Sequence, residues 1–255
     1  MSQPARAYKP RHFASPSHGL SRMTKATSGR SVVLNFEHAA VTGKRTLFPS
    51  MVREPGGEAV LKSGMNNRKI GKEVRKGRWK GYPIYTLTLE ERATCPSSCK
   101  HWTGCYGNKM HLARRFRHGE GLEEILETEL AALQREHPGG FVVRLHVLGD
   151  FYSVEYAMAW LLWLGMFPAL HVFGFTAWHP PTDIGNAIAI VERFYADRFW
   201  VRLSDGPGPR STVTTKRASV PSDAVLCPFE TGQTDTCGTC GLCWTTAKRI
   251  AFLEQ

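Results

Sequence analysis

Long apolar runs are missing from this chain of 255 residues. No apolar stretch approaches the roughly 18 residues that a membrane-spanning helix needs. The N-terminus also lacks an apolar segment of signal-peptide type. We therefore expect a cytoplasmic protein with no membrane partner, in a compartment whose reducing conditions disfavour structural disulfides. Cysteines in such a chain point to metal binding or catalysis.

Glycine motifs for nucleotide phosphates are missing as well. No GxGxxG and no P-loop follows a predicted strand, which removes the usual signatures of a doubly wound nucleotide-binding sheet. Strand patterns alternate with helix patterns, so the sequence predicts an α/β fold with parallel strands. We interpret this fold as a partial (β/α) TIM-like barrel with a cysteine-rich C-terminal extension.

The expected elements follow from apolar periodicity. Strands are predicted at 31–36, 82–89, 141–148, 170–176, 199–204 and 224–227. Helices are predicted around 122–133, after the capping residue Ser153, at 181–195 and at 245–254. The resulting organisation is a disordered basic arm at 1–30, a basic segment at 31–81, the partial barrel at 82–226, and a cysteine cluster with a closing helix at 227–255.

Acidic residues are absent before Glu37, and the whole chain carries 33 Lys and Arg against 22 Asp and Glu, a net charge of +11. Residues 66–80 hold seven Lys and Arg against one Glu, and residues 108–119 hold no acid at all. Such runs suit phosphate backbones, so DNA or RNA is the expected partner. The phosphate contacts are assigned to Lys69, Lys72, Arg75, Lys76 and Arg78. The alternative is a solubilising surface with a disordered tail.

Four of the seven cysteines lie near the C-terminus. Cys237, Cys240 and Cys243 are spaced CxxCxxC, and Cys227, which precedes Pro228, lies ten residues before Cys237. This spacing is typical of ferredoxin ligation of a [4Fe–4S] cluster. One alternative is a zinc ion held by four thiolates. The other is that the four cysteines are unrelated core residues that bind no metal.

The other three cysteines are Cys95, Cys99 and Cys105, in the stretch TCPSSCKHWTGCYG. Three thiolates on a cubane cluster leave one iron free to bind a small molecule. The division of the cysteines therefore predicts one or two [4Fe–4S] clusters, one closed and one open. The alternatives are a Cys3His zinc site completed by His101, and no metal.

Polar residues also follow the predicted strands. The carboxyl ends of parallel strands share one face, where active sites form. Asp150, His146 and Asp205 are therefore candidate catalytic residues that could orient a bound small molecule. For His146 the alternative is a core histidine with satisfied hydrogen bonds.

A triple-cysteine loop after the first barrel strand, with a four-cysteine cluster near the C-terminus, resembles radical S-adenosylmethionine enzymes that carry an auxiliary cluster. Their motif is CxxxCxxC; here CxxxC stands at 95–99, Trp102 takes the third position, and the third thiol follows at Cys105. Leu148-Gly149-Asp150 corresponds in place to the superfamily's GGE-like segment. The resemblance implies S-adenosylmethionine as a further cofactor.

The chain also resembles the phage gene product 88 family, through RLHVLGDFYSVEYAMAW, VFGFTAW, VRLSD, CGTCGLCW and the segment from GKEVRKGRWKG to TCPSSC. This resemblance implies a phage or mobile-element context, and hence the host-cell cytoplasm, but no established activity. The sequence thus supports an iron–sulfur protein on a radical-enzyme-like barrel, as a redox or modification enzyme acting on nucleic acid. The alternative is a non-catalytic nucleic-acid-binding or regulatory phage protein stabilised by iron–sulfur or zinc.

Overall fold

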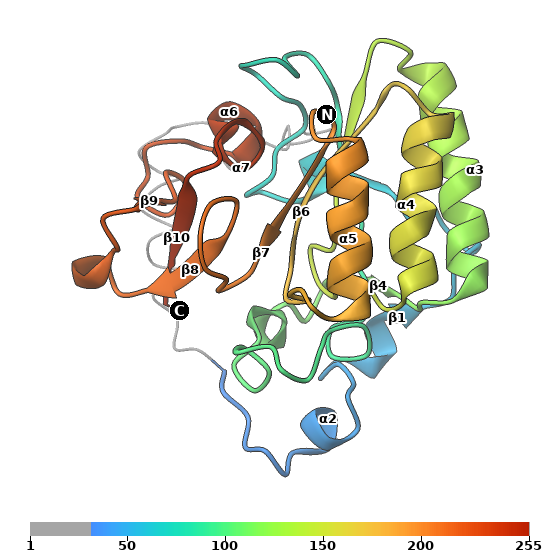
Figure 1. The fold of residues 1–255 in the computed structure, drawn as a ribbon. Coiled ribbons are helices and arrows are strands. Elements are labelled where there is room, and N and C mark those ends of the chain that lie inside the picture. The colour runs from blue at the N-terminus through green and yellow to red at the C-terminus, as the bar shows by residue number, and fades with distance from the viewer. Residues whose placement is uncertain (1–31, 255) are drawn as a thin grey trace, which may run out of the picture.

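A computed structural model gives the structure of the protein over residues 32–254 (Figure 1). The predicted basic arm at 1–30 lies outside these residues. Among the residues that the structure describes, no helix has the length and apolar character to cross a membrane.

The centre of the fold is a five-stranded sheet in the order β2-β3-β5-β6-β7. Its strands are β2 (Lys62–Ser63), β3 (Ile84–Thr86), β5 (Phe141–Arg144), β6 (Leu170–Thr176) and β7 (Phe199–Leu203). β2 runs antiparallel to β3, and the other neighbours are parallel. The predicted α/β fold with parallel strands is therefore confirmed.

Three helices cover one face of this sheet (Figure 1). They are α3 (Glu120–Glu136), α4 (Val154–Met166) and α5 (Asp183–Phe194). The helical spacing of the leucines in α3 explains their burial against the sheet, at positions Leu122, Leu126, Leu130 and Leu133. Ser153 caps α4 as predicted, and Thr182 caps α5.

The cysteine-rich tail covers the opposite face. It holds two short helices, α6 (Cys237–Cys240) and α7 (Leu242–Thr245). Trp244 is fully buried; its ring lies 4.5 Å from that of Phe173 on β6 and stacks on Trp79 at 5.7 Å. The molecule is thus built in three layers, of helices, sheet and tail.

A second, three-stranded sheet has the order β8-β10-β9, with all strands parallel. Its strands are β8 (Thr212–Thr215), β9 (Ala224–Leu226) and β10 (Arg249–Leu253). The predicted closing helix at 245–254 is wrong, because most of that segment is β10. Good helix formers such as Ala251 and Leu253 are overridden by pairing with a strand on each side.

The predicted strand at 31–36 is also wrong, since residues 32–36 form no strand. Val32 and Val33 are exposed, and this segment hydrogen-bonds instead to the cysteine loop, where Leu34 N donates to Thr103 O at 3.2 Å. A closed barrel is not formed within residues 32–254: the central sheet ends at β2 and β7, and only an isolated bridge from Leu203 to Ser211 leads toward the second sheet.

The remaining elements are short. They are α2 (Ala39–Thr42), η1 (Pro49–Met51), η2 (Gly64–Asn66), η3 (Tyr106–Lys109), η4 (Arg217–Ser219), β1 (Val52–Arg53) and its parallel partner β4 (Arg115–Phe116).

Candidate metal centres and basic surface

The loop with the first three cysteines begins beyond the carboxyl end of β3 and is fixed by Thr94. The Thr94 hydroxyl accepts a hydrogen bond from Asp150 N at 3.0 Å and donates one to Glu90 O at 2.9 Å. Gly149 has φ +82°, and a Cβ there would lie 2.6 Å from Thr94 Oγ1. Glycine therefore allows the loop to pack against the turn that follows β5.

The three thiols of this loop share one neighbourhood. Burial raises the pKa of all three thiols, that of Cys105 to about 11, and a backbone hydrogen bond to each sulfur opposes the rise. These bonds come from Arg92 to Cys95, from His101 to Cys99 and from Gly107 to Cys105. The charges of Asp150, Cys105 and Cys99 further raise the pKa of Cys95.

Asp150 lies beside this loop, because its backbone N is hydrogen-bonded to Thr94, the residue before Cys95. Its carboxylate is buried and accepts hydrogen bonds from Phe151 N at 2.8 Å and from Ala177 N at 2.7 Å. Burial raises the pKa of Asp150 to about 7, although the hydrogen bonds favour the charged form. The Asp150 charge in turn contributes to the raised pKa of Cys95 and Cys99.

Asp205 reaches the same loop through His101. His101 Nε2 lies 2.9 Å from Asp205 Oδ2 and 3.1 Å from Thr214 Oγ1, and Thr214 N donates to Asp205 Oδ1 at 2.8 Å. Burial would raise the pKa of Asp205, but the hydrogen bonds that its carboxylate makes with His101 and with Thr214 N lower it. Because Nε2 of His101 is engaged, only Nδ1 remains for a metal, as in carboxylate–histidine–metal arrangements.

The structure does not bring His146 to the thiols. The side chain is buried on the helix side of the sheet, with Nε2 3.0 Å from the Tyr156 hydroxyl of α4 and the ring against Phe151. Burial, with a smaller contribution from Arg144, lowers the pKa of His146 to about 3. His146 is therefore placed as a neutral core histidine.

The four tail cysteines line one small hollow that is partly open to solvent. Thr236 caps α6, and its reciprocal hydrogen bonds with Thr239 form a capping box. Gly241, with φ +75°, ends α6 and lets the chain turn into α7. This turn brings Cys243 to the hollow beside Cys237 and Cys240, while β9 leads into Cys227.

The cysteine side chains do not converge on a common point. Within residues 32–254, no group of three or more His, Cys, Asp and Glu side chains is arranged so that it could hold a metal ion. All seven cysteines are free, and six of them are partly accessible.

Arg144, at the end of β5, lies within electrostatic reach of Asp150, Tyr106 and two tail cysteines, and was missed by the sequence reasoning. Its guanidinium lies over the Phe175 ring at 4.7 Å and donates to His146 O at 3.3 Å. Burial lowers the pKa of Arg144. The negative charges of Tyr106, Cys237, Cys243 and Asp150 raise it, but by less. Arg144 has no carboxylate ion pair among residues 32–254. The available signal was an arginine inside the otherwise apolar strand FVVRLHVL.

Arg202 on β7, also missed, fastens the tail to the sheet. Its buried guanidinium donates to the carbonyl oxygens of Cys243 at 2.9 Å, of Lys248 at 3.0 Å, and also of Leu242 and Thr246. These carbonyls belong to α7 and the residues that follow it. Arg202 thereby fixes the course of the chain from Cys243 to β10.

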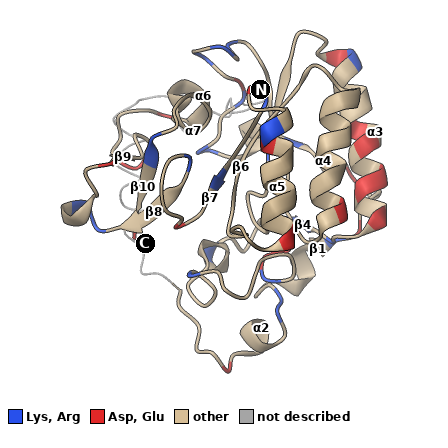
Figure 2. Ribbon diagram, viewed as in Figure 1, with Lys and Arg blue, Asp and Glu red and all other residues tan. Residues whose placement is uncertain are grey.

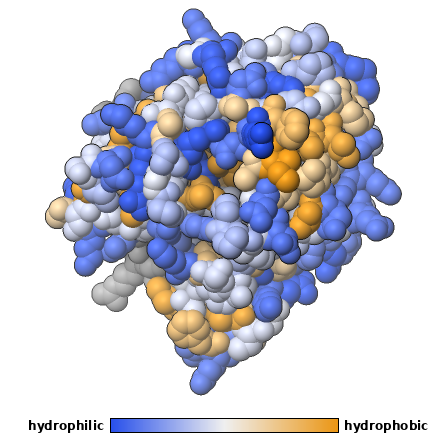
Figure 3. Space-filling model, in the orientation of Figure 1, coloured by the Kyte–Doolittle hydropathy of each residue, from blue (hydrophilic) through white to orange (hydrophobic). Residues whose placement is uncertain are grey.

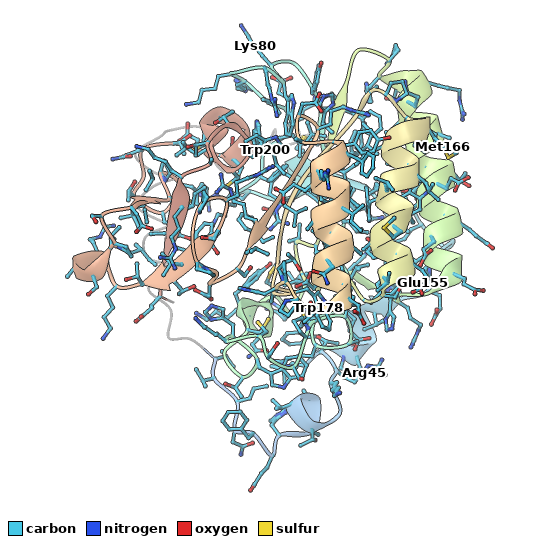
Figure 4. The ribbon with its side chains drawn as sticks, in the orientation of Figure 1. Arg45, Lys80, Glu155, Met166, Trp178 and Trp200 are labelled. Carbon is cyan, nitrogen blue, oxygen red and sulfur yellow. The ribbon has the colours of Figure 1, made fainter. Side chains whose placement is uncertain are left out.

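The basic segment 66–80 lies at the amino ends of the parallel strands, the opposite end from the three-cysteine loop (Figures 1 and 2). In Figure 4, Lys80 and Trp200 mark this end, and Trp178 and Arg45 mark the other. Of the predicted phosphate contacts, Lys72, Arg75, Lys76 and Arg78 are exposed, and Lys69 is partly buried. The second basic run is largely paired with acids, in the pairs Arg114–Glu58, Arg115–Glu91 and Arg117–Glu54.

Lys69 and Arg78 make contacts within the protein. Lys69 Nζ lies 3.1 Å from Glu230 Oε1 and 4.9 Å from the ring centroid of Phe252. Burial lowers the pKa of Lys69, but Glu230 and the tail cysteines raise it, and the net effect is a raised pKa. The guanidinium of Arg78 lies 5.4 Å from the Trp200 ring and donates to Asp197 O.

The family model of gene product 88 matches residues 59–204, more than half of the chain. The chain belongs to the gene product 88 family. The phage-family resemblance of the sequence is confirmed, and with it the bacteriophage context, whereas the match gives no support to the resemblance with radical S-adenosylmethionine enzymes. No curated protein and no solved structure matches the chain.

The region that matches the gene product 88 family holds the central sheet, the three-cysteine loop and the basic segment 66–80. Asp150 and Arg144 lie within it, and Asp205 is the first residue beyond it. The four tail cysteines all lie outside the match.

Proposed function

We propose that this member of the gene product 88 family is an iron–sulfur protein with one closed and one open thiolate site. Cys227, Cys237, Cys240 and Cys243 hold the closed site, and Cys95, Cys99 and Cys105 hold the open one. The open site takes a small anionic molecule in a redox or modification reaction. The observation that carries this proposal is the division of the seven cysteines into a loop of three and a tail hollow lined by four, with the unpaired Arg144 between Asp150 and the tail cysteines.

The donor set of the tail fits a thiolate-bound cluster. Four thiols surround one hollow, and the other residues that line it include the apolar Phe229, Trp244 and Ile250. Backbone hydrogen bonds from Phe229 and Glu230 reach the Cys227 sulfur, which is the kind of support that thiolate ligands of clusters receive. Binding requires the four side chains to turn inward toward a common centre. A cluster bound there would supply structural support between the tail and the sheet.

At the open site the protein would act mainly by orienting the small molecule. Arg144 supplies a guanidinium for its anionic group, and Asp150 supplies a carboxylate that can accept a hydrogen bond from it. Asp205 acts through His101 and is therefore a positioning residue. S-adenosylmethionine, which the radical-enzyme resemblance implies, carries a carboxylate and is one molecule to test.

A second function is favoured by the way in which the basic segment is built on the tail. Cys237 N donates to Lys69 O at 2.7 Å, Gly238 N donates to Ile70 O at 3.0 Å, and Arg75 N donates to Gly238 O at 2.9 Å. A metal in the tail would therefore order the exposed cations of this segment. This arrangement supports a non-catalytic, metal-stabilised nucleic-acid-binding protein, with either an iron–sulfur cluster or zinc.

The test is the metal content of anaerobically purified protein, measured as iron, acid-labile sulfide and zinc in the wild type, Cys99→Ser and Cys240→Ser. We expect iron with sulfide in the wild type, and a partial loss in each variant from a different site. Zinc without sulfide would favour the binding protein. Protein that contains neither metal after reconstitution would overturn both proposals.

His101→Ala distinguishes an open site from a completed one. If His101 is a ligand, the variant loses the metal of the three-cysteine loop; if the site is open, the metal stays and added S-adenosylmethionine or another carboxylate ligand changes the electron paramagnetic resonance spectrum. The matched variant Arg144→Gln should keep the metal and lose this spectral response.

A further inference from the structure

The outer face of helices α4 and α5 is apolar and uncovered. Leu162 and Met166 on α4 are 65% and 55% exposed, and Ile190 and Phe194 on α5 are 43% and 70% exposed. Figure 3 shows the corresponding hydrophobic surface over these two helices. Each pair is four residues apart, so each pair lies on one side of its helix.

This face is unusual for a helix that meets water. A surface helix of a soluble protein normally carries polar residues on its outer side, while a helix that is apolar all round is buried. From Trp160 to Met166 the α4 sequence WLLWLGM contains no charged residue, and its inner side is already packed against the sheet through Trp160 and Leu164. A contiguous apolar patch of this kind marks an interaction site.

The charges around the patch are arranged with opposite signs at its two ends. Glu155 and Asp183 lie in the first turns of α4 and α5, and Arg193 lies in the last turn of α5. Figure 2 shows the acidic and basic ends, and Figure 4 labels Glu155 and Met166 at opposite ends of α4. Neither Asp183 nor Arg193 forms an ion pair within residues 32–254.

We propose that the α4–α5 face is a dimer interface, occupied by the same face of a second copy of this chain. A two-fold axis perpendicular to the helices places them antiparallel across the interface. The apolar side chains then pack at the centre, and Arg193 of each copy meets the acidic end of the other copy. Charges of both signs on one surface make it complementary to itself, as a two-fold interface requires.

The test is the mass of the full chain in solution, measured by sedimentation velocity from about 1 to 100 µM. We expect the wild type to be a dimer. The double variant Leu162→Glu/Phe194→Glu should dissociate at least about tenfold more readily, because it places four carboxylates around the two-fold axis. Leu112→Glu is the matched control, since Leu112 is 77% exposed but lies in the loop after the three cysteines; this variant should remain a dimer.

The charge arrangement is tested separately, with variants that leave the apolar centre intact. Arg193→Glu should weaken the dimer, and Arg193→Glu combined with Asp183→Lys should restore it. Circular dichroism confirms that each variant is folded. A wild-type protein that stays monomeric throughout this range would overturn the proposal, and so would a dimer that the double variant leaves unchanged. Neither outcome depends on metal content.

Discussion

Arg202 shows how much of this fold depends on single buried side chains. One guanidinium donates to four backbone carbonyl oxygens, two in α7 and two on the chain between α7 and β10. Within residues 32–254, the only other donor to the carbonyls of Leu242 and Thr246 is Thr246 N, which is hydrogen-bonded to Leu242 O. The Arg202 side chain therefore takes the place of a strand or helix partner.

We expect Arg202→Leu to destabilise the protein by about 3 kcal/mol or more, because it leaves buried carbonyl oxygens without a donor. Urea denaturation measures the loss. Arg135→Leu is the matched control, because Arg135 is exposed in the last turn of α3 and should change the free energy of unfolding by no more than about 0.5 kcal/mol. Equal unfolding midpoints for the two variants would show that Arg202 does not hold the tail.

His146 gives a prediction for the dependence of stability on pH. Its pKa is about 3 in the folded protein against 6.5 for an ordinary histidine, so below pH 6.5 the unfolded chain binds a proton that the folded protein does not. Stability contributed by His146 therefore falls as the pH falls. Asp150 acts in the opposite direction, because its raised pKa of about 7 means that the folded protein gains a proton there first.

The two effects are separated by comparing the wild type with His146→Gln. We expect the variant to have a lower free energy of unfolding than the wild type at pH 7.5. This deficit should shrink by about 2 kcal/mol at pH 5, because only the wild type must then keep a histidine neutral in the folded state. Denaturant midpoints at the two pH values measure the deficit. A deficit that does not change with pH would mean that the folded protein protonates His146 freely.

At the scale of elements, the helices α3, α4 and α5 and the strands β3, β5, β6, β7 and β9 were predictable from the local sequence, whereas β10 was not. The spacing of leucines in α3 and the capping role of Ser153 are local signals, and both were confirmed. β10 was mistaken for a helix because its pairing partners lie tens of residues away and leave no mark on the local sequence. At 32–36 the opposite error occurred: a strand was predicted where the structure has none. The β-branched residues there have no neighbouring strand to pair with.

The candidate site was predictable to the same degree. Clustered cysteines and Asp150 are visible in the sequence, and the structure has Asp150 N hydrogen-bonded to Thr94, next to Cys95. Arg144 and Arg202 were missed because an arginine within an apolar strand does not reveal which face it occupies or which distant carbonyls it reaches. The side of the sheet on which His146 lies could not be predicted either, because the residue follows the end of β5 with φ +52°, where the alternation of a strand no longer holds.

The basic segment yields a prediction with an internal control. Changing Lys72, Arg75 and Lys76 together to Gln should weaken binding to DNA and RNA of any sequence and flatten its salt dependence, because fewer counterions are released. Arg114→Gln/Arg117→Gln removes cations that are already paired with Glu58 and Glu54, and should change binding little. Fluorescence anisotropy with a labelled oligonucleotide at several salt concentrations measures both. Wild-type protein that shows no salt-dependent binding would mean that the charge only keeps the protein soluble.

At the scale of the whole molecule, the tail forms a complete layer of the structure, which makes its cysteines relevant to stability. Trp244 packs against the sheet between Trp79 and Phe173, next to the hollow lined by the four thiols. Loss of a ligand there should therefore loosen a layer of the core.

If the tail holds a metal, Cys240→Ser should lower the melting temperature and shift the tryptophan emission to the red, because Trp244 becomes exposed to water. Cys99→Ser, in the loop at the other end of the sheet, should leave this emission unchanged. Parallel changes in both variants would show that the emission reports general unfolding, and unchanged melting of Cys240→Ser with its metal intact would contradict a structural role.

The order of strands in the small sheet sets a sequence of assembly. β8 and β9 are both made before β10, yet they do not touch each other in the sheet, because β10 lies between them and pairs with each. During synthesis both strands therefore remain without their partner while the cysteine-rich helices α6 and α7 emerge. Thiols and strand edges are exposed together in this interval, so the period before β10 docks is when the nascent chain is most prone to aggregation.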